Sequence, residues 1–518
     1  MSTEIELKFL VLIDDELCDE KSSVNITKNI TALLQDRQLP FDCEIKKLTN
    51  RYFDTTEQSL RKLDLGLRIR QDNDYIEQTI KTAGAVIGGL HQRPEYNVEL
   101  ADLSPKLSLF PTNIWPDAKL VKKLQRQLIP LFNTDFTRHI WRVKFHKTII
   151  DIAFDQGKLN CSGQSLPICE LELEIVNGNI SDLFSLASLL FNSIKLRPGV
   201  ESKAQRGYQL YSNKNQQYKP IDFEIINYSD KLKGSNKCSE LSDGFVFGIA
   251  VYLQQLQQAV ERYMCLTSFA SLANIVKSLR LLHHGFWLFE SQLSQHWDQV
   301  REDISHFIQL FSWLENAIYL QELMNKTGNY RNKLDYSKEL IYQLKLEEKR
   351  FPDNDMIIQL LHSERFNLLQ MNLVQVAIKN QKIAFFDLQE PNDLTTFAKQ
   401  KLSDCLTTLT NAIPKQTINN AEQVLAIRQL LQRSLLTGYW FGSLFDKEQR
   451  QQFRIPWLDI EQGLIELQSL WIIEQQLEKL VEPAEKIVKW QHGKVDNLLI
   501  ALEHSKKVAL SMKAYWHI

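Results

Sequence analysis

Hydrophobic and polar residues alternate along several short stretches in the first two hundred residues of the chain. In the earliest stretch, Glu4, Glu6 and Lys8 lie on one face of an extended strand, and Ile5 and Leu7 lie on the other. The same period of two predicts further strands over residues 65–70, 75–81, 91–99, 136–144, 149–155 and 168–175. Helical spacing predicts helices over about residues 22–38, 117–128 and 180–193.

After about residue 215 the pattern changes to the spacing of amphipathic helices. Runs rich in Leu, Gln, Glu and Lys with this spacing cover residues 251–266, 304–323, 406–436 and 464–481. A chain of 518 residues is also too long for a single core. We therefore predict a mostly β domain at residues 1–211, a polar linker at 212–220 and an all-α domain at 221–518.

The charged faces of the predicted strands are too numerous to be treated as separate surface edges. A single charged strand face is usually exposed to solvent, but the apolar faces of all these strands must pack on something, and the helices can cover them. The charged faces would then point at each other, as they do when a sheet closes around a polar interior. Because buried charges without partners are costly, such an interior makes sense only if a charged ligand and metal ions fill it.

The inward faces carry two kinds of group. The carboxylates are Glu4, Glu6, Asp151, Asp155, Glu170, Glu172 and Glu174, and the cations are Lys8, Arg68, Arg70, Lys81, Arg93, Arg138, Arg142 and Lys203. Carboxylates two residues apart on a strand suit a hard divalent cation such as Mg²⁺, which is completed by waters and phosphates. Guanidinium groups bind phosphate oxygens bidentately, and several along a channel indicate a linear polyanion. Together they predict a metal-dependent site for a triphosphate or a short polyphosphate.

Composition and the remaining motifs narrow the classes of function. The net charge of −2 gives no support to nucleic-acid or membrane binding, and no segment has the length and hydropathy of a signal peptide or a membrane span. The seven cysteines include no CxxC pair and indicate reduced thiols in a cytoplasmic protein. There is no phosphate-binding GxxxxGK[ST] loop and no nucleophile elbow, and we expect His91, His139 and His146 to be strand-surface histidines. A metal-activated water is therefore the expected nucleophile.

The N-terminal residues also resemble a known family, the CYTH superfamily of triphosphate tunnel metalloenzymes. The opening Glu4-Ile5-Glu6-Leu7-Lys8 is similar to the ExExK signature of that family. The stretches YFDT (52–55), LRIR (67–70), QTIKT (78–82), RPE (93–95), DQG (155–157), ELELE (170–174) and SKAQRGY (202–208) follow in the family's order. ExExK alone is a weak motif, whereas the ordered set is specific and covers about residues 1–210.

The resemblance implies a fold and an assignment of roles. The fold would be an α+β domain with an eight-stranded antiparallel β tunnel flanked by helices, followed by the all-α helical-bundle domain. Glu4 and Glu6 would act in catalysis with Lys8, and the ion would be Mg²⁺ or Mn²⁺. Metal ligands would be Glu4, Glu6, Glu170 and Glu172, with Glu174 ranked lower and Asp151 as a weaker candidate. The phosphate chain would be held by Lys8, Arg68, Arg70, Lys81, Arg93, Arg138 and Lys203.

The helical region resembles the CHAD domain, which is often fused to this type of tunnel domain and binds polyphosphate through His and clustered Arg or Lys. Residues 275–284 match at Arg280 but have Lys277 where His is expected and His284 where an Arg is expected. Arg428 keeps the corresponding Arg of the second half. We expect this domain to be a helical scaffold or docking module.

The predicted function is hydrolysis of inorganic triphosphate to pyrophosphate and phosphate. Two alternatives stay open from the sequence. One keeps the fold with a different substrate, as an adenylate cyclase or a hydrolase of nucleoside or thiamine triphosphate. The other is a non-catalytic polyphosphate-binding protein. In either case the predicted partner is a small triphosphate or polyphosphate, with no nucleic acid and no membrane.

Overall fold

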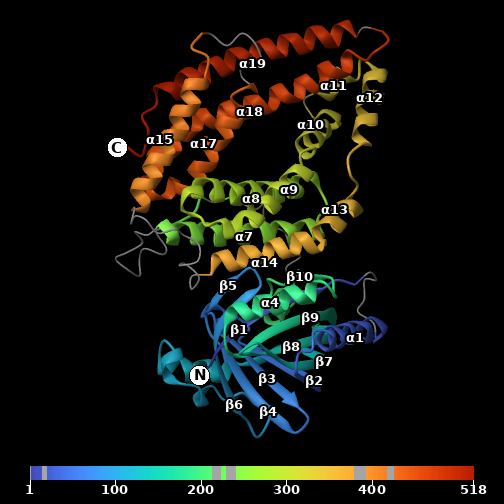
Figure 1. Cartoon of the computed structure of the whole chain (residues 1–518), viewed down its shortest axis with the longest axis vertical. Helices are drawn as coiled ribbons and strands as arrows, with labels where there is room; N and C mark the ends of the chain where they lie inside the picture. Colours follow the sequence, from blue (N-terminus) through green and yellow to red (C-terminus); the bar gives the residue numbers. More distant parts are fainter. Residues whose placement is uncertain are drawn as a thin grey trace. The chain divides into compact units, whose positions relative to one another are not determined.

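The computed structural model describes residues 2–13, 20–212, 223, 225–228, 241–328, 330–378, 393–416, 425–482 and 484–517 (Figure 1). Contacts between residues divide the chain into two compact units. The first comprises Met1–Lys219 with Gln359–Gln375, and the second comprises Pro220–Ile358 with Val376–Ile518. Most of the predicted linker lies outside the described residues, and the predicted domain limits stay a prediction.

A closed antiparallel barrel forms the centre of the first unit. Its strands are β1 (Ser2–Val11), β2 (Phe41–Asp54), β3 (Gly66–Asp72), β4 (Tyr75–Lys81), β6 (Leu90–Glu99), β7 (Ile129–Phe145), β8 (Thr148–Cys161) and β9 (Gln164–Asn177). They pair in the order β1-β9-β8-β7-β2-β3-β4-β6, and a further pairing of β1 with β6 closes the ring. The short strands β5 (Ala85–Ile87) and β10 (Leu196–Pro198) pair with β6 and β1. The predicted eight-stranded antiparallel barrel is thus confirmed.

Helices cover the apolar outer faces of this barrel. On one side lie α1 (Glu20–Asp36) and α4 (Ile180–Phe191), where Phe191 of α4 packs edge-on against Phe9 at a centroid distance of 5.4 Å (Figure 1). On the β3–β4–β6 side, Leu67, Ile69 and Ile80 form a core with the segment that contains η1 (Leu107–Leu109), η2 (Thr112–Ile114) and α3 (Ala118–Gln127). With apolar residues outside, the polar face of each strand is left to the barrel interior.

Two further helices lie close to the barrel rim. They are the short α2 (Ser59–Lys62) and α5 (Lys203–Tyr211). The carboxylate of Asp54, at the end of β2, accepts hydrogen bonds from the backbone N–H groups of Leu60 and Arg61 at 2.8 and 3.0 Å. It also accepts a 2.9 Å hydrogen bond from the hydroxyl of Tyr208 on α5. One buried aspartate therefore fixes both helices relative to the barrel.

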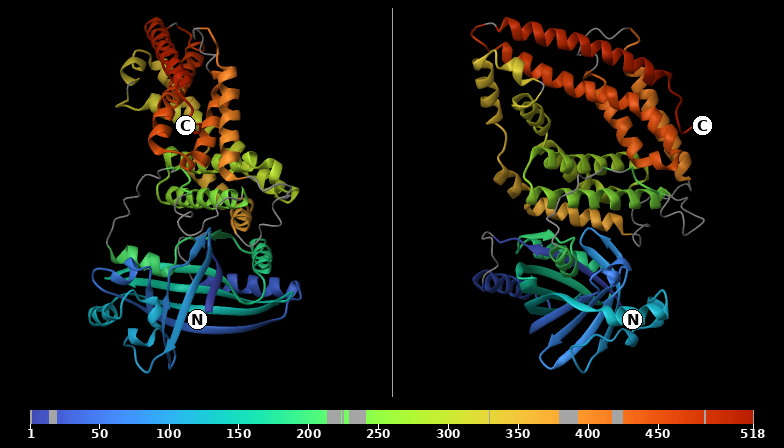
Figure 2. Two further views of the ribbon diagram at one scale, coloured as in Figure 1. Left: turned by 90° about the vertical axis from the view of Figure 1, so that its left-hand side faces the viewer. Right: turned by 180° about the vertical axis from the view of Figure 1, so that it is seen from behind.

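All described elements from residue 241 onward are helices (Figure 2). They are α7 (Leu241–Cys265), α8 (Phe269–Leu288), η3 (Glu290–Gln292), η4 (Gln295–Trp297), α9 (Asp298–Leu310), α10 (Leu314–Met324), α11 (Arg331–Leu334), α12 (Lys338–Glu348), α13 (Asn354–Leu361), α14 (Glu364–Ala377), α15 (Leu394–Ala412), α17 (Arg428–Phe441), η6 (Gly442–Leu444), α18 (Lys447–Leu477) and α19 (Glu485–Ser511). Trp440 is fully buried, and its indole N–H donates to the Leu281 carbonyl oxygen at 2.9 Å. None of the described helices is long and apolar enough to cross a membrane.

Two of the runs with helical spacing each include parts of more than one helix. Residues 304–323 form parts of two helices, α9 and α10, separated by a turn at 311–313. Residues 406–436 are not one helix either, because α15 ends at Ala412 and α17 begins at Arg428. Pro414 follows the end of α15, and a proline cannot continue a helix because it has no N–H and its ring clashes with the preceding turn. Among the described residues, Cys43, Cys161 and Cys405 are free thiols, as predicted.

Candidate active site inside the barrel

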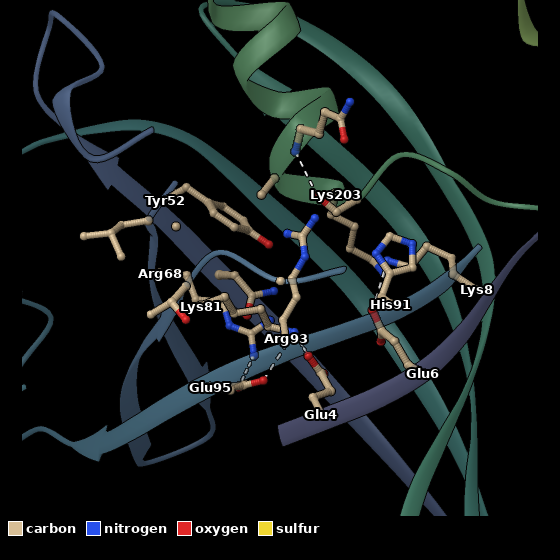
Figure 3. Close-up of a pocket in the computed structure, with 18 of the residues that line it drawn as sticks. Glu4, Glu6, Lys8, Tyr52, Arg68, Lys81, His91, Arg93, Glu95 and Lys203 are labelled. Carbon is tan, nitrogen blue, oxygen red and sulfur yellow. Dashed lines mark hydrogen bonds and ion pairs between the residues drawn. The ribbon is translucent and has the colours of Figure 1, made fainter. Parts of the chain in front are cut away.

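The barrel encloses a cavity of about 510 Å³ whose lining is dominated by charged side chains (Figure 3). All seven cations predicted to bind substrate line it: Lys8, Arg68, Arg70, Lys81, Arg93, Arg138 and Lys203. The carboxylates in the lining are Glu4, Glu6, Asp64, Glu95, Glu172 and Glu174. The strand alternation read from the sequence therefore placed these cations on the inward face.

Carboxylates gather where β1 meets β6 and β9, and we call Glu4, Glu6, Glu95 and Glu174 the acidic wall. Pairing of β1 with β9 sets Glu6 directly opposite Glu174. Burial, with Glu4 and Glu6 nearby, raises the pKa of Glu174 to about 7. Burial and its carboxylate neighbours also raise the pKa of Glu4, against the effect of Lys81. The acidic wall thus holds more negative charge than its own cations neutralise.

Glu95 differs because it has two cations of its own. Figure 3 shows Glu95 between Lys81 and Arg68. Its carboxylate oxygens lie 3.3 Å from the Nζ of Lys81 and 3.4 Å from a terminal nitrogen of Arg68. Burial alone would raise the pKa of Glu95, but Lys81 and Arg68 outweigh it and lower the value to about 2. The ammonium group of Lys81 also pairs with Glu4. Lys81 therefore joins β4 to the carboxylates of both β1 and β6.

A second charged group lies between β1, β8, β9 and α5. Figure 3 shows Lys203 projecting from the first turn of α5, and its Nζ lies 2.7 to 2.9 Å from oxygens of Asp155, Glu170 and Glu172. Lys8 lies 2.8 Å from Glu172. Burial alone would lower the pKa of Lys203, but the three carboxylates raise it well above its usual range. Both lysines are therefore charged in the neutral pH range.

Arg138 is held in the same group. Its Nε and one terminal nitrogen lie 2.6 and 2.7 Å from the two carboxylate oxygens of Asp155, in the bidentate arrangement. The same terminal nitrogen lies 2.6 Å from Glu172. Glu170 is held in turn by Lys203 and Arg206.

Three arginines have free hydrogen-bonding capacity. Within the described residues, the buried Nε of Arg68 and that of Arg93 have no hydrogen-bond partner. The Nε of Arg70 donates to the side-chain oxygen of Asn50 at 2.9 Å. Burial, with Arg68 and Arg138 close by, lowers the pKa of Arg70 to about 10. Unpaired guanidinium nitrogens facing a cavity are the donors that a phosphate chain would satisfy.

The donor set suits a hard divalent cation, although no site is preformed. In the described part of the chain, no three His, Cys, Asp or Glu side chains converge closely enough to hold a metal ion. The acidic wall nevertheless offers oxygen ligands alone, and burial together with Glu4 and Glu6 raises the pKa of Glu174 there. Mg²⁺ is often held by only one or two carboxylates, with waters and phosphate oxygens completing its shell. The residues present therefore fit such an ion.

The structure separates the four predicted metal ligands into two places. Glu4 and Glu6 belong to the acidic wall, whereas Glu172 and Glu170 are engaged by the lysines and arginines described above. Glu170 does not line the cavity. Asp151 also lies outside the lining, where it forms a 2.7 Å ion pair with the largely exposed Arg142. Glu174, ranked lower from the sequence, lies beside Glu4 and Glu6.

Other residues of the site were missed in the sequence. Asn50 and Glu95 line the cavity, although neither was among the predicted site residues. His91 was expected at the strand surface, which was wrong, because it is buried and lines the cavity. The sequence could have predicted this position, because alternate residues of a strand share a face and His91 therefore lies on the same face as Arg93 and Glu95. Burial, with Lys8 nearby, lowers the pKa of His91 to about 4.

A closed antiparallel barrel with this charged interior has the architecture of a triphosphate tunnel. Residues 2–208 match the CYTH domain. The match covers the barrel and the helices around it, and the described elements from residue 241 onward, all helices, lie outside it.

Individual proteins are similar to parts of this chain. The chain is 39% identical over 165 residues to an inorganic triphosphatase of Haemophilus influenzae, covering 32% of this chain and 46% of that protein. It therefore spans less than half the length of this curated relative. Two solved structures are also similar. One is a protein from Hippeastrum described as an adenylyl cyclase with a dominant triphosphatase activity (17% identity, TM-score 0.29, covering 40% of this chain and 95% of that one). The other is the CHAD domain of the plant Ricinus communis (14% identity, TM-score 0.42, 57% and 98%).

Proposed function

We propose that the protein hydrolyses inorganic triphosphate to pyrophosphate and phosphate with the help of Mg²⁺ or Mn²⁺. The observation that carries this proposal is the cavity itself, whose lining combines eight lysine and arginine side chains with a wall of carboxylates. A binder of polyanions would gain nothing from the acidic wall without a metal ion, because it repels phosphate. The CYTH match and the name of the Haemophilus influenzae relative support the same reaction class, a phosphoanhydride hydrolase.

The chain's residues would divide the work. Arg68, Arg70 and Arg93 would bind the phosphate oxygens, with Lys8, Lys81, Arg138 and Lys203 lining the rest of the path. Glu4 and Glu6 would hold the metal, with Glu174 beside them. Glu170 and Glu172 could serve as further ligands only by releasing their lysines. When bound, the metal would supply charge neutralisation and an activated water.

Replacing the first two glutamates tests the proposal. Glu4→Ala and Glu6→Ala should each lower phosphate release from tripolyphosphate by about 100-fold or more, the scale of loss when a group that stabilises transition-state charge is removed. Phosphate release with Mg²⁺ and with Mn²⁺ gives the measurement, and the exposed Glu99 on β6 provides a matched Glu99→Ala control. Undiminished turnover in both variants would overturn the metal assignment. Cyclic AMP made from ATP, without tripolyphosphate hydrolysis, would favour the cyclase alternative.

A further inference from the structure

Three side chains form one row across the inner face of three neighbouring strands. Asn50 of β2 is the register partner of Arg70 on β3 and of Thr134 on β7. Its amide oxygen accepts from the Nε of Arg70 at 2.9 Å, and its amide nitrogen donates to the Thr134 hydroxyl at 2.9 Å. Asn50 and Thr134 are both fully buried. Because the Nε of Arg70 can only donate, it fixes which end of the amide faces it, and the Thr134 hydroxyl accepts from the other end.

The partner of Arg70 is neutral, and this is unusual for a cation in this cavity. Arg138 is neutralised by the bidentate carboxylate of Asp155, and Lys203 by three carboxylates. Within the described residues, the hydrogen bond to Asn50 is the one side-chain hydrogen bond of Arg70. A neutral acceptor on Nε holds the guanidinium plane in place without cancelling its charge, so the two terminal nitrogens keep their capacity for an anion.

The row also has a defined position relative to the acidic wall. In the eight-strand ring, β2 is four strands from β1 in either direction, so these two strands face each other across the barrel. Asn50 therefore lies on the side of the barrel opposite Glu4 and Glu6, and Arg70 lies on the neighbouring strand β3. A linear anion that binds metal at the acidic wall would meet Arg70 with the part of its chain farthest from the metal.

We propose that Asn50 is a positioning residue that orients Arg70 as a charged anchor for the metal-distal phosphate of the substrate. The inference deepens the proposed function and rests on it. It makes a particular chemical demand of position 50, namely a hydrogen-bond acceptor of the right reach that carries no charge. An aspartate at position 50 could accept the same hydrogen bond, but it carries a negative charge. It would pair with Arg70 as Asp155 pairs with Arg138 and would neutralise the guanidinium group.

The test measures the affinity of the full-length protein for inorganic tripolyphosphate by calorimetry in EDTA, where metal-dependent turnover is absent. Asn50→Asp should raise Kd about tenfold or more, the scale expected when a charge-assisted hydrogen bond is lost. Asn50→Ala should raise Kd by a smaller factor, because the arginine loses its anchor but keeps its charge. In an Arg70→Ala background, Asn50→Asp should change Kd little further, because there is no guanidinium left to orient.

A matched control comes from Gln78 on β4, another fully buried amide, whose side chain bonds the Lys106 backbone and does not line the cavity. Gln78→Glu should lower thermal stability without changing Kd. Unchanged Kd in Asn50→Asp, or an equal loss with and without Arg70, would overturn the positioning role. Absent turnover with metal, together with the predicted changes in Kd, would overturn the proposed hydrolysis and leave the positioning role standing. No measurable binding by the wild type would overturn both.

Discussion

Two glutamates of the acidic wall differ in pKa although both face the same cavity. Glu95 has Lys81 and Arg68 within 3.4 Å, and its pKa falls to about 2. Glu174 has Glu4 and Glu6 as near neighbours, and its pKa rises to about 7. At the level of single residues, the charge of the neighbouring side chains therefore decides whether the pKa of a buried carboxylate falls or rises.

Residue 284 shows the same dependence in the helical unit. His284 was aligned from the sequence with a position that binds anions, but it is buried, and its Nε2 lies 2.9 Å from the hydroxyl of Thr437. Burial, with Arg433 and His283 nearby, lowers its pKa to about 3. The imidazole is therefore neutral in the folded protein, and in this conformation it is a core histidine.

We predict that His284 makes stability fall in mild acid. In the unfolded chain the pKa of His284 returns to about 6.5. Between about pH 6.5 and 3, the unfolded state therefore binds a proton on this residue and the folded state does not. The contribution to the free energy of unfolding is fully present above about pH 6.5 and is lost as pH falls toward 3. At pH 5 the loss should be about 2 kcal/mol.

Chemical denaturation of the wild type and of His284→Gln at pH 7 and pH 5 measures this effect. Glutamine can keep a hydrogen bond to Thr437 but does not titrate. The wild type should lose about 2 kcal/mol more than the variant between the two pH values. Equal losses in both proteins would contradict the assignment.

At the scale of elements, period-two alternation was sufficient for strands whose two faces have different surroundings. β3 and β9 are examples, with Leu67, Ile69, Leu171 and Leu173 buried on the outer face and charges inside. Most of β2 escaped prediction because residues 42–45 at its start are all exposed, so hydrophobicity does not alternate there. The partners inside the barrel could not be predicted either, because strand register fixes them and a single sequence does not state register.

The packing of α5 on β7 gives a prediction at this scale. Gly207 lies so close to Phe132 that an added Cβ would come within 2.1 Å of the ring. Gly207→Ala should therefore destabilise the first unit by about 1–3 kcal/mol and displace α5, which carries Lys203. Activity should fall together with stability. Thermal unfolding and tripolyphosphate turnover measure the two effects.

Gly66 supplies the control, because an added Cβ there meets nothing within 4 Å. Gly66→Ala should leave stability within about 0.5 kcal/mol of the wild type. A Gly207→Ala variant as stable as Gly66→Ala would show that α5 can shift without cost.

At the scale of the whole molecule, bulk properties hide the site. The net charge of the chain is only −2, although eight lysine and arginine side chains line one cavity. The change in hydrophobic period predicts a boundary near residue 215, whereas residues 359–375 cluster with the first unit. A single boundary along the sequence cannot give this assignment, because the spacing of apolar residues predicts a helix but not the unit to which the helix belongs.

The helical unit contains its own arginines, and the structure indicates how they are occupied. Glu315 of α10 lies 2.7 Å from Arg280 on α8 and 2.6 Å from Arg428 on α17. Both arginine side chains remain partly exposed, at 35% and 22%. One carboxylate thus holds two guanidinium groups that an external anion would otherwise bind.

We predict that the intact protein binds one tripolyphosphate per chain, in the barrel, because Glu315 blocks the second site. Glu315→Ala should free both guanidinium groups and add a second, weaker binding event in calorimetry at low salt, which fades as salt screens it. Glu322→Ala, a change of the same kind at an exposed position of α10, should leave the stoichiometry at one. Because Arg280 and Arg428 come from different helices, removing either one in the Glu315→Ala background should abolish the second event. A wild type that already binds two would contradict the block by Glu315, and an unchanged stoichiometry in Glu315→Ala would show that the two arginines cannot form an anion site.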